Sequence, residues 1–301
     1  MTTLRVLLHI AAHYDYELHS LDFRTAFLQG SLHEEIWLRR PPGFTETFPA
    51  GTQWRFHQPV YGLRPAPHEW HDTLRTTLAA LGFAPATTDP SLLLRTDMSL
   101  PPFYILVFVE NLIFATLDTE ALTLVKSELQ KRHTCTNLGR LALRLPVLLA
   151  TAHTSVYEPL TLRSTFGQVH MGLVLGGRGP VVLTGHADTS WVDDSATQRS
   201  SQGYTFSLGS GSISWRSTHS SSDFSSSCEA EIYAGAMAAQ ELRWLTYLLI
   251  DLGEQPHSPP VLYQRGQLRL AYVATRANTA DVFTKALLSV VGFTTGANNS
   301  L

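Results

Sequence analysis

Two short apolar runs, residues 103–109 and 112–115, flank the polar pair Glu110 and Asn111. Runs rich in aromatic and β-branched residues around a two-residue break are typical of a tight β-hairpin. Because the apolar residues are continuous rather than alternating, we expect both faces of the two strands to be covered. A carboxylate is costly to bury at the tip of such a hairpin. Glu110 is therefore either a polar turn residue or one member of a metal-binding carboxylate cluster.

Other elements follow from the same kind of pattern. Helical spacing of apolar residues predicts helices over 2–13, 68–81, 119–133, 228–252 and 280–288. Strands are predicted over 17–23, 36–38, 54–60 and 181–186, with a second hairpin over 203–208 and 212–217. The strand over 17–23 carries Asp22 near its end, and the strand over 181–186 leads to Asp188. Residues 141–180 lack a regular pattern and are interpreted as a junction.

Composition narrows the class of protein. The chain has 301 residues, 44% of them hydrophobic and 16% charged, which suits a folded protein of about two domains. A net charge of -3 argues against a protein that grips long nucleic acids mainly by charge. Cys135 and Cys228 predict neither a disulfide framework nor a zinc site. With no apolar run of membrane length, we expect no membrane partner and an intracellular protein, cytoplasmic or nuclear and not secreted.

Several motifs occur in a fixed order. They are Leu-Asp-Phe-Arg-Thr-Ala-Phe-Leu-Gln-Gly (21–30), Arg-Pro-Pro-Gly-Phe (40–44), Val-Tyr-Gly-Leu-Arg-Pro-Ala-Pro-His-Glu-Trp (60–70) and the 103–115 hairpin. This series resembles the reverse transcriptase of copia-type LTR retrotransposons. His-Ala-Asp-Thr-Ser-Trp (186–191), Ser-Ser-Ser-Cys-Glu-Ala-Glu-Ile-Tyr-Ala (225–234) and Ala-Asp-Val-Phe-Thr-Lys-Ala-Leu (280–287) resemble the RNase H domain that follows in such polyproteins.

The resemblance implies an α+β fold in two parts. We expect a truncated, palm-like polymerase domain over 1–140 and an irregular junction over 141–180. A shortened RNase H-like domain is expected over 181–288, with a tail over 289–301.

The polymerase part of the family uses two Mg²⁺ ions, which take oxygen ligands from converging carboxylates. By resemblance, Asp22 is the carboxylate at the strand end, and the hairpin tip should carry two adjacent aspartates. Here the pair is Glu110 and Asn111. Phe27 falls where the family places an aromatic ring against the sugar of the incoming nucleotide.

In the same family, Tyr61 and Gly62 lie in the loop that shapes the nucleotide pocket. This chain departs from the family at the hairpin tip. Asn111 is neutral, and Glu110 is one methylene longer than aspartate, which moves its oxygens by roughly 1 Å and suits Mg²⁺ poorly. We therefore expect impaired polymerisation.

The RNase H part of the family holds two metal ions with four carboxylates. By resemblance Asp188 is the first ligand, Glu231 or Glu229 the second, and Asp281 the last. Glu231 is preferred over Glu229 because Glu-Ile-Tyr-Ala matches the helix face expected of the ligand. The third acid is expected just after Tyr263, but Tyr263 runs directly into Gln264, as if a segment had been deleted.

The predicted function is therefore RNA-directed DNA polymerisation with an RNase H-like region, catalytically impaired. By resemblance its partners are an RNA template and an RNA–DNA hybrid, and the resemblance also implies self-association with other parts of the retrotransposon polyprotein. Two alternatives stay open at this point: a non-catalytic module that binds nucleic acid or a polyprotein partner, and a pseudogene product without function.

Overall fold

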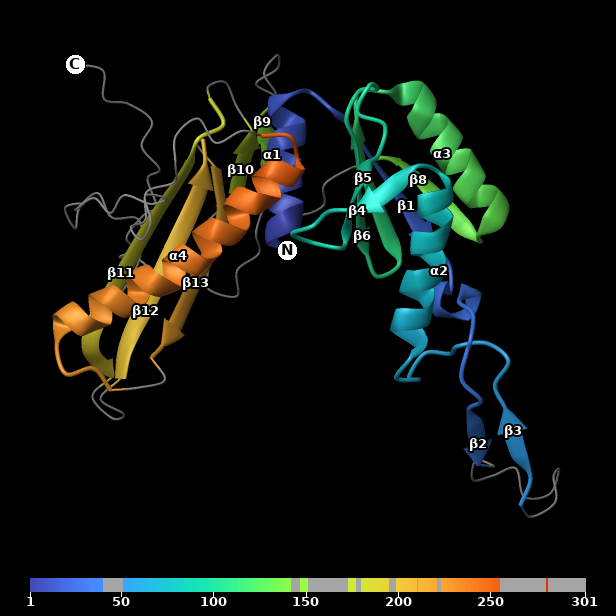
Figure 1. Cartoon of the computed structure of the whole chain (residues 1–301), viewed down its shortest axis with the longest axis horizontal. Helices are drawn as coiled ribbons and strands as arrows, with labels where there is room; N and C mark the ends of the chain where they lie inside the picture. Colours follow the sequence, from blue (N-terminus) through green and yellow to red (C-terminus); the bar gives the residue numbers. More distant parts are fainter. Residues whose placement is uncertain are drawn as a thin grey trace, which may run out of the picture. The chain divides into compact units, whose positions relative to one another are not determined.

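The structure is a computed structural model that describes residues 1–39, 51–141, 147–150, 173–176, 180–194, 199–209, 211–220, 223–254 and 280 (Figure 1). Asp281, the remainder of the predicted last helix, the Tyr263–Gln264 step and the predicted tail lie outside these residues. The chain falls into two compact units. We call the unit of Ile10–Val147 and Thr151–His170 the N-terminal unit, and that of Met1–His9, Leu148–Ala150 and Met171–Leu301 the C-terminal unit.

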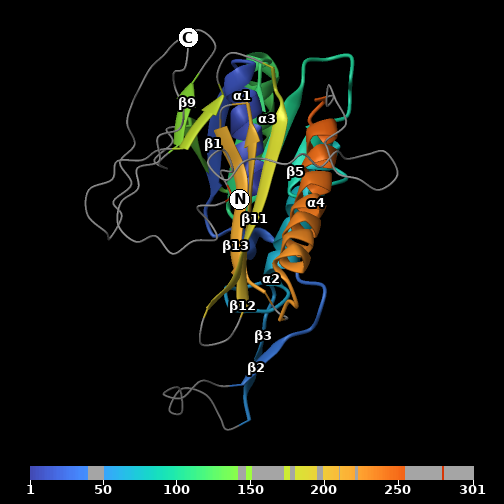
Figure 2. The same ribbon diagram turned by 90° about the vertical axis from the view of Figure 1, so that its left-hand side faces the viewer.

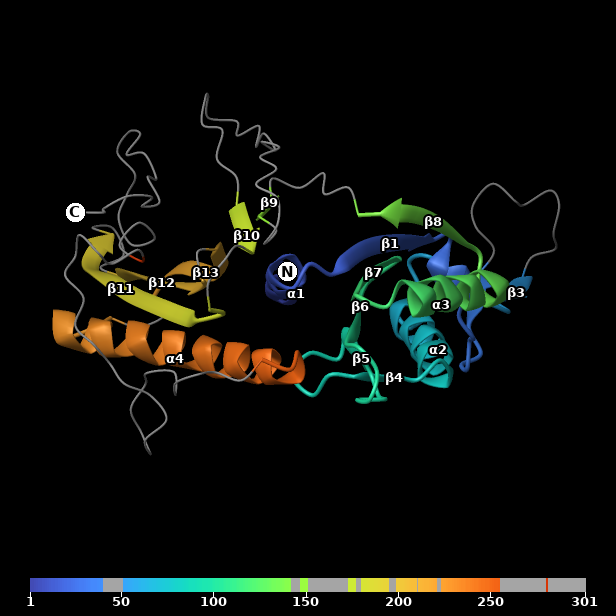
Figure 3. The same cartoon turned by 90° about the horizontal axis from the view of Figure 1, so that it is seen from above.

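The N-terminal unit is a six-stranded antiparallel sheet with two helices on one face (Figures 1 and 3). Its strands are β1 (Glu17–Phe23), β4 (Phe83–Pro85), β5 (Leu92–Arg95), β6 (Phe103–Phe108), β7 (Asn111–Thr116) and β8 (Cys135–Arg140), in the spatial order β4-β5-β6-β7-β1-β8. The helices are α2 (Ala66–Ala80) and α3 (Thr119–Arg132). A short 3₁₀ helix, η1 (Ala26–Gln29), follows β1, and β2 (Trp37–Arg39) pairs with β3 (Gln53–Arg55) as a separate ribbon.

The core of this unit lies between the sheet and the two helices. Its buried members include Leu21 and Phe23 of β1, Phe114 of β7, Trp70 of α2 and Leu129 of α3. Helix α3 begins at a side-chain cap, because Asp118 accepts a hydrogen bond from the Ala121 amide. The alternating pleat leaves the opposite face of β1 and β7 for the residues between these core positions.

The predicted hairpin is confirmed, but its turn is one residue earlier than expected. Residues Phe103–Leu106 are buried on both faces of β6, as the continuous apolar run indicated. The ladder closes at the Phe108–Asn111 pair, so the turn residues are Val109 and Glu110 rather than Glu110 and Asn111. Val109 has a φ of +55°, which a β-branched residue adopts only when its surroundings impose it.

Other predictions hold with shifted ends. Helix α1 (Thr2–His13) and strand β1 have the predicted bounds, whereas α2 begins two residues earlier than expected. The strand predicted over 54–60 is only the three residues of β3. Strands β4, β5 and β8 were not predicted, and β8 is an edge strand with largely polar, partly exposed residues.

The C-terminal unit contains a three-stranded antiparallel sheet and a long helix along it (Figures 1 and 2). The strands are β11 (Leu183–Asp194), β12 (Arg199–Leu208) and β13 (Gly211–His219), and the helix is α4 (Ser227–Asp251). Strands β9 (Val147–Ala150) and β10 (Leu173–Gly176) form a separate pair. Strand β11 is longer than the predicted 181–186, so Asp188 lies within the strand instead of following it.

Helix α4 packs through small residues spaced four apart, Ala230, Ala234 and Ala238, which are all buried. This spacing forms one stripe on the helix and allows a close approach to its neighbour. The helix bounds agree with the predicted 228–252 to within one residue at each end. None of the helices in the described part of the chain is long and apolar enough to cross a membrane.

Gly185 of β11 makes room for a buried ring. A Cβ atom at Gly185 would lie 2.1 Å from Cε1 of Phe206, whose ring is buried on the neighbouring strand. We expect Gly185→Ala to lower the free energy of unfolding by about 1–3 kcal/mol, the usual effect of overpacking, as measured by urea denaturation.

Gly235→Ala is the matched control, because a Cβ at Gly235 on α4 meets nothing within 4 Å. It should be neutral or stabilising, since alanine favours helix. Adding Phe206→Leu should recover part of the loss in Gly185→Ala. An unchanged stability of Gly185→Ala would contradict the packing described for this sheet.

Candidate functional site

Asp22 and Asn111 lie directly opposite each other in the N-terminal unit. Strand β1 is paired with β7 on one side and β8 on the other, and the register with β7 places Asp22 against Asn111. Because Leu21 and Phe23 point into the core beside the helices, the pleat directs Asp22 and Asn111 to the opposite face of the sheet. Both residues are partly exposed there.

The tip of the β6–β7 hairpin is fixed by two hydrogen bonds to its backbone carbonyls. The Phe23 amide donates to the carbonyl of Glu110 at 2.7 Å, and Trp70 Nε1 donates to the carbonyl of Val109 at 3.0 Å. These bonds hold both turn residues, one from β1 and one from α2. They explain how the strained φ of Val109 is maintained.

Trp70 is itself held firmly. Its side chain is 2% exposed, and its ring packs edge-on against Phe23 at 4.8 Å and against His133 at 5.6 Å between ring centroids. Edge-to-face contacts of this kind favour one relative orientation of the rings. The position of the hairpin tip is therefore set by the core and not by the turn sequence.

Phe27 lies in the short helix η1 of the loop that follows β1, and the conformation of this loop sets its position. Thr25 adopts a left-handed conformation, and η1 begins at the next residue. The Gln29 amide group donates to the carbonyls of Arg24 and Thr134 and accepts from the Thr134 amide, so it joins the loop to the start of β8.

Gly30 ends this loop where it approaches α2. A Cβ atom there would lie 3.1 Å from the Trp70 backbone nitrogen. A larger residue would therefore push the loop away from the helix.

Tyr61 lies in contact with both Phe27 and Glu110. Its ring lies 4.7 Å from that of Phe27 between centroids, and its hydroxyl donates a hydrogen bond to Oε1 of Glu110. The hydrogen bond to Glu110 is the main cause that raises the pKa of Tyr61, with burial next and the charge of Asp22 adding to it. Gly62 has a φ of +93°, which favours glycine for conformational reasons alone, since a Cβ would meet nothing nearby.

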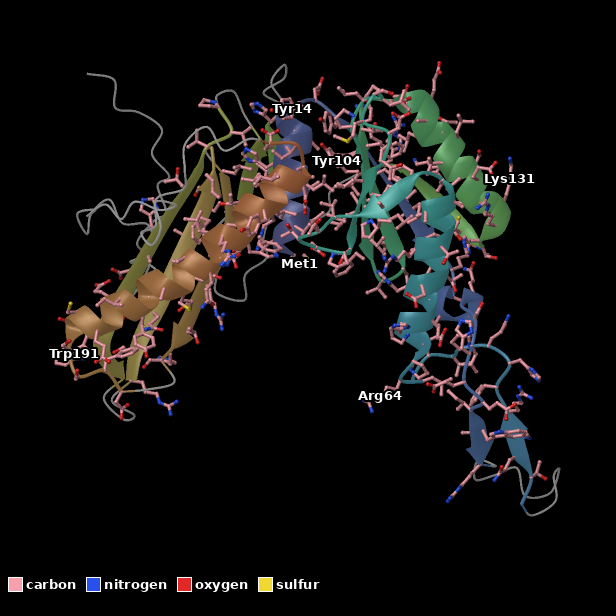
Figure 4. The ribbon with its side chains drawn as sticks, viewed as in Figure 1. Met1, Tyr14, Arg64, Tyr104, Lys131 and Trp191 are labelled. Atoms are coloured by element: carbon pink, nitrogen blue, oxygen red, sulfur yellow. The ribbon has the colours of Figure 1, made fainter. Side chains whose placement is uncertain are left out.

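The structure thus brings together five of the residues singled out in the sequence: Asp22, Phe27, Tyr61, Glu110 and Asn111. Figure 4 marks Arg64 on the loop that continues from Tyr61 into α2. What the sequence did not identify is the support of the site by Trp70 and Gln29. Trp70 ends the 60–70 motif, and this was the only sequence signal for it.

The residues of this group do not fit a two-metal centre. In the part of the chain that the structure describes, no three histidine, cysteine, aspartate or glutamate side chains are grouped so that they could hold a metal ion. Among the residues that the structure describes, Asp22 and Glu110 are the only carboxylates singled out at this site, and Glu110 already accepts a hydrogen bond from Tyr61. Mg²⁺ is usually held by one or two carboxylates together with waters and the phosphates of its substrate. Two ions therefore require more carboxylates than Asp22, the one of this pair that the Tyr61 hydroxyl does not occupy.

In the C-terminal unit, the two glutamates that the sequence offered as alternatives have different surroundings. Ser226 caps α4, because its hydroxyl accepts a hydrogen bond from the Glu229 amide. The Glu229 carboxylate accepts hydrogen bonds from the amide and hydroxyl of Ser225, which lower its pKa. Burial of the carboxyl, followed by the negative charge of Asp188, raises the pKa of Glu231. Glu231 and Asp188 therefore lie within electrostatic reach of each other, whereas Asp281 lies outside the described residues.

Comparison with known proteins gives this arrangement a context. The family model described as reverse transcriptase (RNA-dependent DNA polymerase) matches residues 1–157. The retrovirus-related Pol polyprotein from transposon RE2 of Arabidopsis thaliana is 26% identical over an alignment of 407 residues, covering 96% of this chain and 28% of that protein. The corresponding polyprotein from transposon RE1 is 24% identical, covering 95% and 27%. That from transposon TNT 1-94 of Nicotiana tabacum is 22% identical, covering 84% and 26%.

The chain thus spans less than a third of the length of these curated relatives. The alignments with RE2 and RE1 run over 407 and 404 residues, which is more than the 301 residues of this chain. The relatives therefore contain segments that have no counterpart here.

His133 provides a pH-dependent test of the packing beneath the site. Burial, with Arg132 adding to it, lowers the pKa of His133, so the unfolded chain binds a proton there more readily than the folded one. Stability from this residue is present above the unfolded pKa of about 6.5 and is lost as pH falls below it. We expect His133→Gln to reduce the loss of unfolding free energy between neutral and mildly acidic pH, measured by urea denaturation.

His57→Gln serves as the control for the loss of a histidine, because His57 is exposed. An identical pH dependence in His133→Gln and the unaltered chain would contradict the burial of this imidazole.

Proposed function

The chain belongs to the reverse transcriptase (RNA-dependent DNA polymerase) family, and on that premise we propose that it is a retrotransposon-derived polymerase of the copia type with impaired catalysis. The observation that carries the proposal is the convergence of Asp22, Phe27 and Tyr61 on the tip of the β6–β7 hairpin. Strand end, aromatic residue and loop all meet where the family resemblance expects an incoming nucleotide.

Impairment is proposed from the ligand set. In such polymerases two Mg²⁺ ions activate the primer hydroxyl and hold the triphosphate. Asn111 contributes no charge, and Glu110 is committed to the Tyr61 hydroxyl. Asp22 is then the carboxylate best placed for an ion, and one such ligand does not make a two-metal site.

The C-terminal unit is proposed to be a shortened RNase H-like region. Its three-stranded meander is followed by α4, and Asp188 on β11 influences Glu231 on that helix. Two interacting carboxylates from a strand and a helix are what the resemblance calls for. The sequence has no acid just after Tyr263, where the resemblance expects the third ligand.

A second function, nucleic-acid binding without catalysis, is favoured by the β2–β3 ribbon. The register pairs Trp37 with Arg55 and Arg39 with Gln53, so these side chains share one face of the ribbon. Trp37 is 51% exposed and Arg39 is exposed beside it, although Arg55 forms an ion pair with Glu35 at 3.0 Å. An exposed aromatic ring beside guanidinium groups suits a single strand of nucleic acid, such as an RNA template. This ribbon would provide a local binding surface for nucleic acid, whereas the net negative charge of the chain does not favour such binding.

Primer extension tests the proposed impairment. On an RNA template with Mg²⁺, the chain should extend a primer no better than its Asp22→Asn variant. Glu110→Asp combined with Asn111→Asp restores adjacent aspartates and should raise extension above that background by about tenfold or more, because one misplaced ligand can cost about 10²-fold.

Efficient extension by the unaltered chain, lost in Asp22→Asn, would show that catalysis is intact. Adding Asp22→Asn to the double variant should abolish any restored activity. A restored activity that survives this change would place the chemistry elsewhere in the chain.

RNA binding tests the ribbon. Trp37→Ala should weaken the binding of a short single-stranded RNA about 5- to 100-fold, which corresponds to the loss of one stacked base. Arg39→Gln should weaken it less and reduce its dependence on salt. Both effects are measurable by fluorescence anisotropy at two or more salt concentrations. Arg243→Gln, an exposed arginine on α4, is the control, and an equal effect of Arg243→Gln would refute a specific role for the ribbon.

A further inference from the structure

The hydrogen bond between Tyr61 and Glu110 occupies the acid that should hold a metal ion. The Tyr61 hydroxyl donates to Oε1 of Glu110, which gives this carboxylate a partner from the protein itself. A hydrogen bond to a charged acceptor is among the stronger ones that a protein makes. Any cation that approached Glu110 in its place would have to compete with this donor.

Both partners of this hydrogen bond are positioned independently of each other. Tyr61 is placed by its ring contact with Phe27 and by the left-handed turn at Gly62. Glu110 is placed by the bonds from Phe23 and Trp70 to the hairpin tip. The longer side chain of glutamate, compared with aspartate, extends the carboxylate beyond the tip, where the hydroxyl meets it.

The neutral side chain of Asn111 lowers the negative charge that a cation at this site would otherwise balance. It faces Asp22 directly across the β1–β7 pair. An aspartate there would place two like charges opposite each other, which is destabilising unless a cation lies between them. An asparagine amide avoids that repulsion and can donate to a neighbouring carboxylate. The two changes at the hairpin tip therefore act in the same direction.

We propose that the Tyr61 hydroxyl takes the place of a divalent ion at Glu110, and that the neutral Asn111 opposite Asp22 removes the charge that a second ion would balance, so that the site is closed to Mg²⁺. Tyr61 is then a positioning residue for Glu110. This inference rests on the proposed function, because it takes the hairpin tip to be a former polymerase site. Beyond the proposed function, it identifies the protein groups that stand in place of the metal ions.

Mn²⁺ binding tests the inference without any need for activity. Isothermal titration with MnCl₂ is compared between the unaltered chain, Asn111→Asp, and Asn111→Asp combined with Tyr61→Phe. We expect no binding that depends on Asp22 in the unaltered chain. Tyr61→Phe in the Asn111→Asp background should tighten binding about tenfold to a hundredfold, the size of one hydrogen bond to a charged group. Tyr247→Phe, an exposed tyrosine on α4, is the matched control and should change nothing.

The inference fails if the unaltered chain binds Mn²⁺ and Asp22→Asn abolishes that binding. It also fails if Tyr61→Phe leaves Mn²⁺ binding by Asn111→Asp unchanged. Should Asn111→Asp not fold, Tyr61→Phe alone decides the matter by thermal unfolding in EDTA. Its midpoint should fall below that of Tyr247→Phe, and equal midpoints would overturn the proposal.

These outcomes are separable from those of the proposed function. A chain that binds Mn²⁺ through Asp22 yet does not extend a primer would refute the replacement of the metal and leave the impaired polymerase in place. A chain that extends a primer efficiently would refute the impairment itself, whatever its Mn²⁺ titration gave.

Discussion

Two backbone carbonyls at the tip of the β6–β7 hairpin determine the geometry of the candidate site in the N-terminal unit. The backbone amide of Phe23 donates a hydrogen bond to the carbonyl of Glu110, and the indole Nε1 of Trp70 donates one to the carbonyl of Val109. Both donors are buried and lie in contact with each other. A hairpin tip would otherwise be the most mobile part of such an element, because it has few neighbours of its own. Here it is attached to the central strand and to a core helix, so Asp22, Glu110 and Asn111 stay in register.

This constraint also explains why changes of charge at the hairpin tip need not disrupt the fold. The core of the unit is apolar and lies on the helical face of the sheet, whereas Asp22 and Asn111 lie on the other face. Substitutions at the hairpin tip change the charge of the open face and leave the buried contacts unchanged. The neutral Asn111 and the hydrogen-bonded Glu110 reduce the repulsion that adjacent acids would create. The fold of this unit can therefore tolerate changes of charge at the hairpin tip.

Residue periodicity predicted strongly patterned elements, including α1, β1 and α4, and it placed Asp22 near the end of a strand. The expectation that this strand end meets the hairpin tip came from the family resemblance. Periodicity missed β8, whose polar residues form an edge strand stabilised by pairing with β1 and not by burial. It also placed the turn one residue late. Turn propensity favours polar residues, but tertiary hydrogen bonds impose a positive φ on Val109 instead. The bond from Tyr61 to Glu110 joins residues 49 positions apart, and no local pattern could reveal it.

A cross-link between positions 22 and 111 tests the central claim most directly. With Cys135 and Cys228 changed to serine, Asp22→Cys combined with Asn111→Cys should form a disulfide on mild oxidation. Directly opposed residues in antiparallel strands have Cα atoms about 4.5–5.5 Å apart, within the range of a disulfide. Ser20→Cys combined with Asn111→Cys, about 7–8 Å apart on the diagonal, should form little or none. Equal cross-linking of both pairs, or none in the first, would contradict the register on which this account of the site depends.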